Sequence, residues 1–337
     1  MDLLLAFETS CDETAVAVVT GEKAPHVVAE KVLSQTDLHK LYGGVVPELA
    51  SREHLKALPL LTEEALLRAG ATITDIEAVA VTRGPGLKGC LLMGIGFAKG
   101  VATARGIPLI GVNHIEGHIL SPFIENPELP FPYLAVVVSG GHTEILAIRG
   151  LGAYELLART MDDAAGEAFD KSANLLGFEY PGGPKLATLA DSVSTSRFNL
   201  PRVMRESESA FSFSGLKTAI ALLVKKHRSE LADPVIRAEL SHAVQGAIID
   251  ALMHKVKHAV TTSKITNVAL CGGVAANAAL RAAVQKLPKV KLFSPATQHC
   301  ADNAAMIGYA GALRWKRGDA DSLSLDALPR WPVEECR

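Results

Sequence analysis

The chain repeats one order of secondary-structure patterns, and this repetition limits its fold more than any other feature of the sequence. A buried-type strand, a polar turn and a second strand are predicted near residue 3, in LLLAF, ETSCDET and AVAVVT, and again near residue 133, in PYLAVVVS, GGHTE and ILAIRG. A strand, a glycine turn and a helix follow in both halves, near residues 76 and 265. Because the order agrees although the residues differ, we infer an internal duplication.

Two similar α/β halves favour the duplicated, two-lobed actin-like fold of sugar kinases, Hsp70 and actin. The predicted N-terminal lobe covers residues 1–125, and the predicted C-terminal lobe covers residues 126–337 with an inserted segment at about 150–220. In such a fold a central cleft holds a nucleotide, whose phosphates meet backbone N–H groups of the opposing turns. The alternative is a plain doubly wound α/β protein with ordinary glycine turns.

The charge balance limits how the chain can bind nucleic acid. The formal net charge of the 337 residues is −2, whereas a domain that attracts nucleic acid through its own field is strongly basic. A nucleic-acid site must therefore be a local patch or be shared with a partner. The basic stretches at 197–205 and 225–228 are the best local candidates for contacts with a phosphate backbone.

The cysteines and the apolar runs indicate in which cellular compartment the protein is found. Five cysteines without a C-x-x-C pair argue against a disulfide framework and favour a reducing compartment. The opening MDLLLAFETS is not typical of a signal peptide, and no apolar run reaches transmembrane length. We expect a cytoplasmic protein without a membrane segment.

The stretch NHIEGH contains two histidines, His114 and His118, that are four residues apart. On a helix this spacing lets both imidazoles reach one ion. The pair follows a predicted strand end, where α/β sheets bind ligands. Asp302 in HCADNAAM offers a third ligand from the second half, although a simple helix N-cap is the alternative role for it. Two histidines and one carboxylate suit Fe(II), with zinc as the other candidate.

The spacing alone is a weak signal, because His254 and His258 in MHKVKH share it. Lys255 and Lys257 lie between the two histidines, and their charge repels a metal ion, so we interpret this pair as surface. NHIEGH also differs from the H-E-x-x-H pattern of zinc proteases, since Glu116 lies one position too late.

Three further stretches carry polar groups suited to a ligand. In VVVSGGHTEI, a strand runs into Ser139, Gly140 and Gly141, whose backbone can approach an anion closely, with an ordinary hairpin turn as the alternative. In ALCGGVAANAAL, Asn277 begins a helix and suits a ribose or base contact. ETSCDET contributes Glu8, Asp12 and Glu13 at a strand end, where acids can orient a metal or accept a proton.

Ten stretches together resemble the TsaD (Gcp/YgjD) family over residues 3–332. They occur in the family's order: FETSCDETAVAVV, GGVVPELASREH, TRGPGLKGCLLMG, NHIEGH, VSGGHTEI, DDAAGEAFDK, YPGGP, FSFSGLKT, CGGVAAN and ADNAAM. The resemblance implies a tRNA adenosine threonylcarbamoyltransferase with the actin-like fold. Such an enzyme moves the threonylcarbamoyl group of threonylcarbamoyl-AMP to N6 of adenosine 37 in tRNAs that read codons beginning with A.

The resemblance also implies roles for individual residues. The metal ligands would be His114, His118 and Asp302, and Asp12 and Glu13 match acids near the reacting centre. The residues implied to bind the substrate are Val137, Val138, Ser139, Gly140, Gly141, Asp170, Gly183 and Asn277. One family acid after PGGP is replaced here by Ala187, so no role is assigned to that position.

The implied partners are a shorter TsaB-like paralogue that forms a heterodimer with this protein, and a TsaE-like P-loop ATPase. The small-residue helix after RGPGLKG, which includes Met93 and Ala98, is our predicted dimer face. Three other functions remain as alternatives: a metallopeptidase using HIEGH, an actin-like ATPase or small-molecule kinase, and a non-catalytic scaffold.

Overall fold

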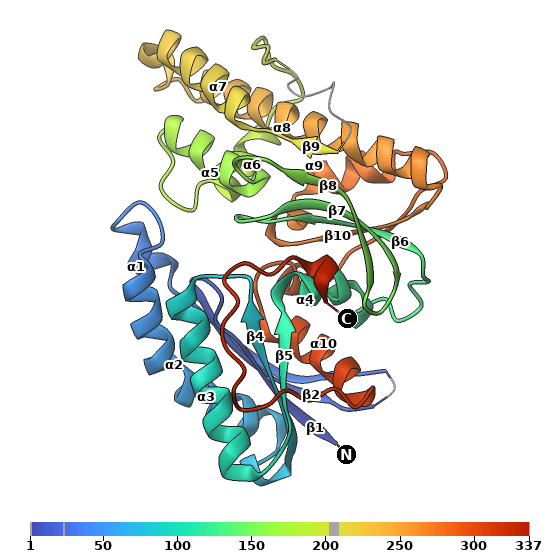
Figure 1. Ribbon diagram of the computed structural model, residues 1–337. Helices are drawn as coiled ribbons and strands as arrows, with labels where there is room; N and C mark the ends of the chain where they lie inside the picture. Colours follow the sequence, from blue (N-terminus) through green and yellow to red (C-terminus); the bar gives the residue numbers. More distant parts are fainter. Residues whose placement is uncertain (1, 23, 202–208, 337) are drawn as a thin grey trace. The chain divides into compact units, whose positions relative to one another are not determined.

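The computed structural model describes residues 2–22, 24–201 and 209–336 (Figure 1). The chain forms two compact units: unit 1 contains residues 1–128 and 295–337, and unit 2 contains residues 129–294. These units are defined by contacts between residues. The predicted lobes 1–125 and 126–337 follow instead from the repeated order of elements in the sequence. The lobe boundaries therefore stay a prediction. None of the described helices is long and apolar enough to cross a membrane.

Unit 1 contains a five-stranded sheet in the order β3-β2-β1-β4-β5. Its first three strands are antiparallel, and β4 and β5 continue in parallel from β1. All six residues of β1 are buried, as expected for a central strand covered on both faces. The strands are β1 (Leu3–Glu8), β2 (Glu13–Thr20), β3 (Val27–Ser34), β4 (Ile76–Gly84) and β5 (Leu109–Asn113).

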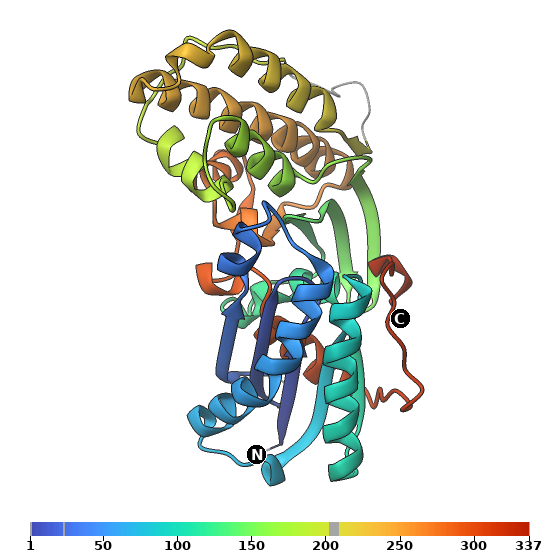
Figure 2. The same cartoon turned by 90° about the vertical axis from the view of Figure 1, so that its left-hand side faces the viewer.

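Helices cover both faces of this sheet. Side chains alternate along β1, so Leu3, Leu5 and Phe7 join the apolar core with residues of α2 and α3. Figure 2 shows α2 and α3 side by side over that face. The helices of unit 1 are α1 (Thr36–Lys40), α2 (Pro47–Ala69), α3 (Lys88–Arg105), α4 (His114–Leu120) and α10 (Ala304–Lys316), with short 3-10 turns at Ile73–Asp75, Ser121–Ile124, Thr297–His299 and Val333–Glu335.

The opposite face of the sheet is covered by α10, which approaches the strands through two glycines. A Cβ atom on Gly308 would lie 2.5 Å from Val19 Cγ2, and one on Gly311 would lie 2.5 Å from Ala80 Cβ. No side chain fits at these positions unless the helix moves away from the sheet.

The segment after α10 runs along the β5 edge of the sheet. The backbone N–H of Asp321 donates to the Leu109 carbonyl at 2.7 Å. Farther along, the Trp331 carbonyl accepts from Asn113 Nδ2 at 2.9 Å. This segment therefore contacts both ends of β5.

Unit 2 contains a six-stranded sheet in the order β11-β10-β6-β7-β8-β9. Its strands are β6 (Tyr133–Val138), β7 (Thr143–Gly150), β8 (Ala153–Thr160), β9 (Ala210–Phe211), β10 (Asn267–Cys271) and β11 (Lys291–Phe293). Its helices are α5 (Ala165–Leu175), α6 (Gly183–Ala190), α7 (Ser214–Lys226), α8 (Pro234–Ser263) and α9 (Ala278–Gln285), with 3-10 turns at Arg228–Glu230 and Gly273–Ala276.

The strand order confirms the predicted duplication. Strands β8-β7-β6-β10-β11 repeat β3-β2-β1-β4-β5, with the same two antiparallel and two parallel pairings. The polar turn after β1 and the Ser-Gly-Gly turn after β6 are therefore equivalent. Between β8 and α8, unit 2 has α5, α6, β9 and α7, whereas the corresponding stretch of unit 1, between β3 and α2, has only the short α1.

The close contact of α10 predicts opposite effects for two Gly→Ala changes. Gly308→Ala should lower the free energy of unfolding by about 1–3 kcal/mol, because the new methyl group overpacks the contact with β2. Gly100→Ala on α3 meets open space and should raise stability by about 0.5–1 kcal/mol through helix propensity. Chemical denaturation of both variants tests this, and equal effects would contradict the packing argument.

Candidate metal centre and substrate-binding residues

The His114 and His118 side chains are positioned by the junction of β5 and α4. Asn113 ends the strand and caps the helix, since its side-chain oxygen accepts the N–H groups of Ile115 at 2.8 Å and Glu116 at 3.2 Å. His114 is thus the first helical residue and His118 lies one turn later. The helical spacing predicted from the sequence is confirmed, and every residue of α4 is buried.

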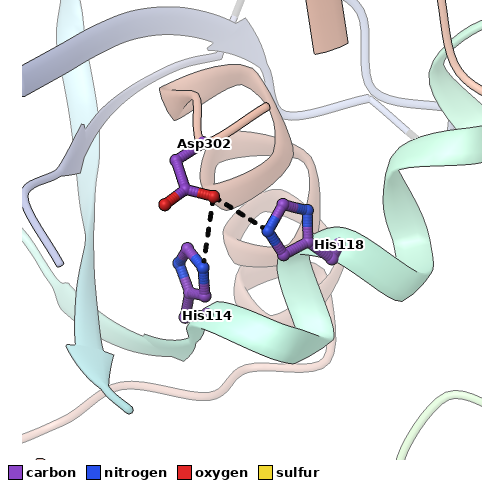
Figure 3. A group of neighbouring side chains, drawn as sticks. All are labelled: His114, His118 and Asp302. Atoms are coloured by element: carbon purple, nitrogen blue, oxygen red, sulfur yellow. Dashed lines mark hydrogen bonds and ion pairs between the residues drawn. The ribbon is translucent and has the colours of Figure 1, made fainter. Parts of the chain in front are cut away.

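Asp302 reaches the two histidines from the segment before α10 (Figure 3). Its Oδ1 lies 3.0 Å from His118 Nε2 and 3.5 Å from His114 Nε2. The N-cap of α10 is Asn303, which accepts the Met306 N–H, so the alternative role of Asp302 as a cap does not apply. Asp302 lies in the same compact unit as the histidines, because α10 packs against the first sheet.

The other nitrogen of His114 faces the end of β1. Its Nδ1 lies 3.0 Å from Glu8 Oε2 and 3.2 Å from Ser10 Oγ. Glu8 also accepts hydrogen bonds from the Thr82 hydroxyl and the Ser10 N–H. A carboxylate on Nδ1 fixes the ring and directs Nε2 toward Asp302, as in carboxylate–histidine–metal arrangements. The sequence marked Glu8 as one of three acids at a strand end but did not indicate this contact.

The charges of the acids and of the histidines shift one another's pKa values. Burial opposes a charged imidazole, but Asp302 and Glu8 outweigh it and raise the pKa of His114 well above its usual value. Burial likewise opposes the charge of Asp302, yet the two histidines hold its pKa well below the usual range. The site therefore favours a positive charge between Glu8 and Asp302. When no metal is bound, a proton on His114 supplies this charge.

The residues fit a divalent metal by their donor set. One ligand atom from each of His114, His118 and Asp302 lies within 4.8 Å of the others, and the histidines are buried. Two neutral imidazoles and one carboxylate suit Fe(II) or zinc. The three residues that the sequence predicted to act together do come together.

Glu116 takes no part in this group. Arg314 Nε and Nη2 donate to the two oxygens of the Glu116 carboxylate at 2.7 and 3.1 Å, and both side chains are largely buried. The acid that the metallopeptidase alternative requires as a base is thus held in a bidentate ion pair. His254 on α8 is exposed and His258 is half-buried, in agreement with their assignment to the surface.

Asp12 and Glu13 lie beside the candidate metal centre. Burial, then the charges of Asp302 and Asp12, raise the pKa of Glu13 to about 9. Glu13 and Asp302 also line an open groove of about 800 Å³ that follows β3. The group is therefore reached from solvent within unit 1.

In unit 2 the turn after β6 is closely packed. The Ser139 N–H donates to the His142 carbonyl at 2.8 Å, and Ser139 Oγ accepts the His142 N–H at 3.1 Å. A Cβ atom on Gly166 would lie 2.5 Å from the Ser139 carbonyl oxygen, and one on Gly272 would lie 2.5 Å from that of Val138. The predicted stretch Val137 to Gly141 is thus a tight turn bordered by two obligatory glycines.

Other predicted substrate-binding residues of unit 2 hold turns and helix ends. Asp170 Oδ1 accepts the N–H groups of Gly182 at 3.0 Å and Gly183 at 2.8 Å, which fixes the PGGP turn. Asn277 caps α9 by accepting the Leu280 N–H and donates to Gln245 Oε1 at 2.9 Å. Asp170 and Gly183 are therefore brought together, while a ligand contact of Asn277 would be additional to its capping role.

Comparison with solved structures agrees with the fold. HypF from T. kodakarensis has a TM-score of 0.60 at 16% identity, over 94% of this chain and 48% of that chain. Component A of (R)-2-hydroxyglutaryl-CoA dehydratase from Acidaminococcus fermentans has a TM-score of 0.56 at 15% identity, over 94% of this chain and 99% of that chain. At these identities the likeness is one of fold alone.

The protein is thus an actin-like, duplicated α/β protein with a His-His-Asp group in its first unit. The sequence model of the family described as "TsaD: tRNA N6-adenosine threonylcarbamoyltransferase" matches residues 26–309. The chain belongs to the TsaD family, and it is a transferase that modifies tRNA.

The raised pKa of His114 predicts that metal binding depends on pH. The ion pair of His114 with its acids stabilises the metal-free chain below pH 6.5, and this stability is lost as the pH rises through the raised pKa. A histidine binds a metal through a deprotonated nitrogen, so Zn²⁺ displaces this proton. The apparent affinity should rise by about tenfold per pH unit while His114 is protonated in the metal-free chain, and should level off above its raised pKa.

Competition with a chelator and calorimetric proton release measure this dependence. Glu8→Gln should release fewer protons, because His114 loses one of its two acids. His118→Ala should lose tight binding, whereas His254→Ala, from the histidine pair on α8, should match the wild type. A pH-independent affinity would contradict the assignment.

Proposed function

We propose that this transferase moves the threonylcarbamoyl group from threonylcarbamoyl-AMP to N6 of adenosine 37, in tRNAs that read codons beginning with A. The products are threonylcarbamoyladenosine and AMP. The observation that carries the proposal is the group of His114, His118 and Asp302 in a chain of the TsaD family. A protein that modifies tRNA and whose five cysteines are thiols fits the cytoplasm, which we propose as its location.

His114, His118 and Asp302 are proposed to hold one divalent metal, Fe(II) or zinc. When bound, the metal would orient the acyl adenylate and stabilise developing negative charge. The chain's own contribution is to fix the ring of His114 and direct its Nε2 toward Asp302, through Glu8 and Ser10 on Nδ1.

The substrate's phosphate and carbamoyl end are proposed to meet the backbone of Val137 to Gly141. Glycines at 140 and 141 leave open space where a side chain would stand, because an added Cβ meets no atom within 4 Å at either position. The adenosine would contact Gly183 and Asn277, and Asp170 is proposed to bind the ribose hydroxyls. Asp170 is held firmly for this role by the two N–H groups of the PGGP turn.

Transfer requires a proton acceptor. The N6 nitrogen attacks the carbamoyl carbon, the bond from that carbon to the AMP phosphate oxygen breaks, and N6 loses a proton. Glu13, with a raised pKa of about 9, carries a proton near neutral pH in the metal-free chain. We propose Asp12 as the acceptor, with Glu13 beside it near the reacting centre.

The tRNA is proposed to contact basic side chains outside the metal group. Lys225, Lys226 and Arg228 are exposed around the end of α7 and suit phosphate contacts. In the other stretch, Arg197 pairs with Glu239 at 2.9 Å, and residues 202–205 lie outside the described part of the chain. A near-neutral chain fits a tRNA site shared with partner proteins.

The partners proposed are a TsaB-like paralogue, as a heterodimer, and a TsaE-like P-loop ATPase. The proposed dimer face is the outer side of α3. Gly96 and Gly100 meet open space there, and Leu92 is 36% exposed. Ala98, which the sequence suggested for this face, is completely buried in the core of unit 1, and Met93 is half-buried. The face therefore has to be tested at Leu92 and Gly96.

A transfer assay tests the proposed function. Purified protein and its partners receive unmodified tRNA, threonine, bicarbonate, ATP and the enzyme that makes the adenylate, and the modified nucleoside is measured by mass spectrometry. Wild type should form the product, and His114→Ala should reduce the rate by at least about 100-fold, since the ligand group is broken. His254→Ala is the matched control and should keep full activity.

Each possible result distinguishes the proposed transferase from an alternative function. Equal product from wild type and His114→Ala would remove the metal from the reaction. Absence of product from the fully assembled wild-type system would favour the ATPase alternative, which phosphate release in the same samples measures. Protein cleavage that chelators stop would favour the metallopeptidase.

The heterodimer proposal predicts that Gly96→Glu weakens association by at least about tenfold, because a charged side chain enters a close helix contact. Analytical ultracentrifugation of the mixed proteins measures this. Lys226→Glu on α7 is the control and should leave the dimer intact. An unchanged dimer with Gly96→Glu and with Leu92→Glu would exclude this face.

A further inference from the structure

The turn that carries Asp12 and Glu13 is held by three successive backbone carbonyls. The Ser10 carbonyl accepts the Leu87 N–H at 2.8 Å, and the Asp12 carbonyl accepts the Gln35 N–H at 3.0 Å. Between them, the Cys11 carbonyl accepts a hydrogen bond from His54 Nε2 at 2.9 Å. Only this middle contact comes from a side chain, so it is the one that a substitution can remove.

His54 lies on α2 and is completely buried. A carbonyl only accepts hydrogen bonds, so the ring proton is on Nε2 and Nδ1 is an acceptor. Nδ1 accepts from the Thr14 hydroxyl at 2.7 Å and from Gln35 Nε2 at 3.3 Å. Burial lowers the pKa of His54, which favours this neutral tautomer.

The hydrogen-bond chain continues away from the turn in one direction. Gln35 Nε2 also donates to the Ala50 carbonyl at 3.3 Å, which fixes the orientation of the amide, and Gln35 Oε1 accepts from His39 Nε2 at 3.2 Å. His39 Nδ1 accepts the Val46 N–H at 3.3 Å. Every donor and acceptor is thus determined, and aligned bonds in a buried chain strengthen one another.

We propose that His54 is a positioning residue for the transfer reaction, because its Nε2–H holds the Cys11 carbonyl and thereby orients the acids Asp12 and Glu13. This inference rests on the proposed function for its effect on rate, since it assumes that Asp12 accepts the N6 proton. Its structural part, the fixed turn, stands independently of that assumption.

The geometry explains why one hydrogen bond matters here. Cys11 and Asp12 share a peptide unit, so a rotation that releases the Cys11 carbonyl also turns the Asp12 backbone N–H and shifts its side chain. Proton acceptance requires a separation of about 3 Å between the heavy atoms. A misplacement of about 1 Å lowers a rate by about 100-fold.

Two substitutions at His54 separate its contacts. The amide nitrogen of Gln occupies the position of Nε2, so His54→Gln keeps a donor for the Cys11 carbonyl. The amide of Asn occupies the position of Nδ1, so His54→Asn keeps partners for Thr14 and Gln35 but does not reach Cys11. His254→Asn on α8 is the control for the substitution itself.

The first measurement is the transfer rate of the assembled system. His54→Asn should lower kcat by about 10- to 100-fold with little change in the KM for tRNA, and His54→Gln should restore most of it. Zn²⁺ affinity should stay unchanged in both, since the metal group is intact. Equal loss in the Asn and Gln variants, unchanged kcat in His54→Asn, or an effect on KM alone would overturn the proposal.

The second measurement does not depend on activity. Cys11 is half-buried while the other four cysteines are buried, so its alkylation by iodoacetamide reports on the turn. His54→Asn should be alkylated at Cys11 several-fold faster than wild type, and His54→Gln at the wild-type rate. If wild type shows no transfer, the proposed function fails, and the alkylation rates alone then decide the positioning role: equal rates overturn it.

Discussion

The close contact between α10 and the first sheet is the constraint on which the candidate metal centre depends. Gly308 and Gly311 let the helix axis approach β2 and β4, and the start of the helix places Asp302 beside His118. The ligand group thus joins residues nearly two hundred positions apart, and α4 supplies only part of it. Two glycines, which have no side chain to contribute, are as necessary to the site as its ligands.

The duplication gives the two units equivalent turns with different chemistry. After β1 the turn carries Asp12 and Glu13 and supports His114 through Glu8 and Ser10. After β6 the equivalent turn is Ser139 to Gly141, with glycines around it and no acidic side chain. The same backbone frame therefore provides acids beside His114 in one unit and a small turn without acidic side chains in the other.

Sequence reasoning predicted what local patterns determine. The duplication, the small-residue helix after RGPGLKG, and the grouping of His114, His118 and Asp302 were all expected and are present. Strand β3 was missed, because it is an edge strand whose half-exposed residues lack a clean alternation. Ala98 was assigned to the surface because small residues suit both a helix interface and a tightly packed core, and only the tertiary contacts distinguish the two.

The contacts that support the site could not be predicted from the sequence, because they too depend on tertiary packing. The pairing of Arg314 with Glu116, and of Glu8 with His114, depends on which elements meet across the core. Periodicity assigns a face to a residue but not the partner on that face. Only the acids of ETSCDET gave a signal, since three carboxylates at one strand end require a cation or other donors nearby.

The division of unit 1 into two stretches has a consequence for the order of folding during synthesis. Unit 2 is continuous, so all its strands emerge from the ribosome before α10 is made. In unit 1, one face of the sheet has no cover until residues 304–316 arrive, and Asn113 lacks its Trp331 contact until later still. The candidate metal centre is thus among the last parts to be completed, and a nascent chain that lacks residue 302 has only two of its three candidate ligands.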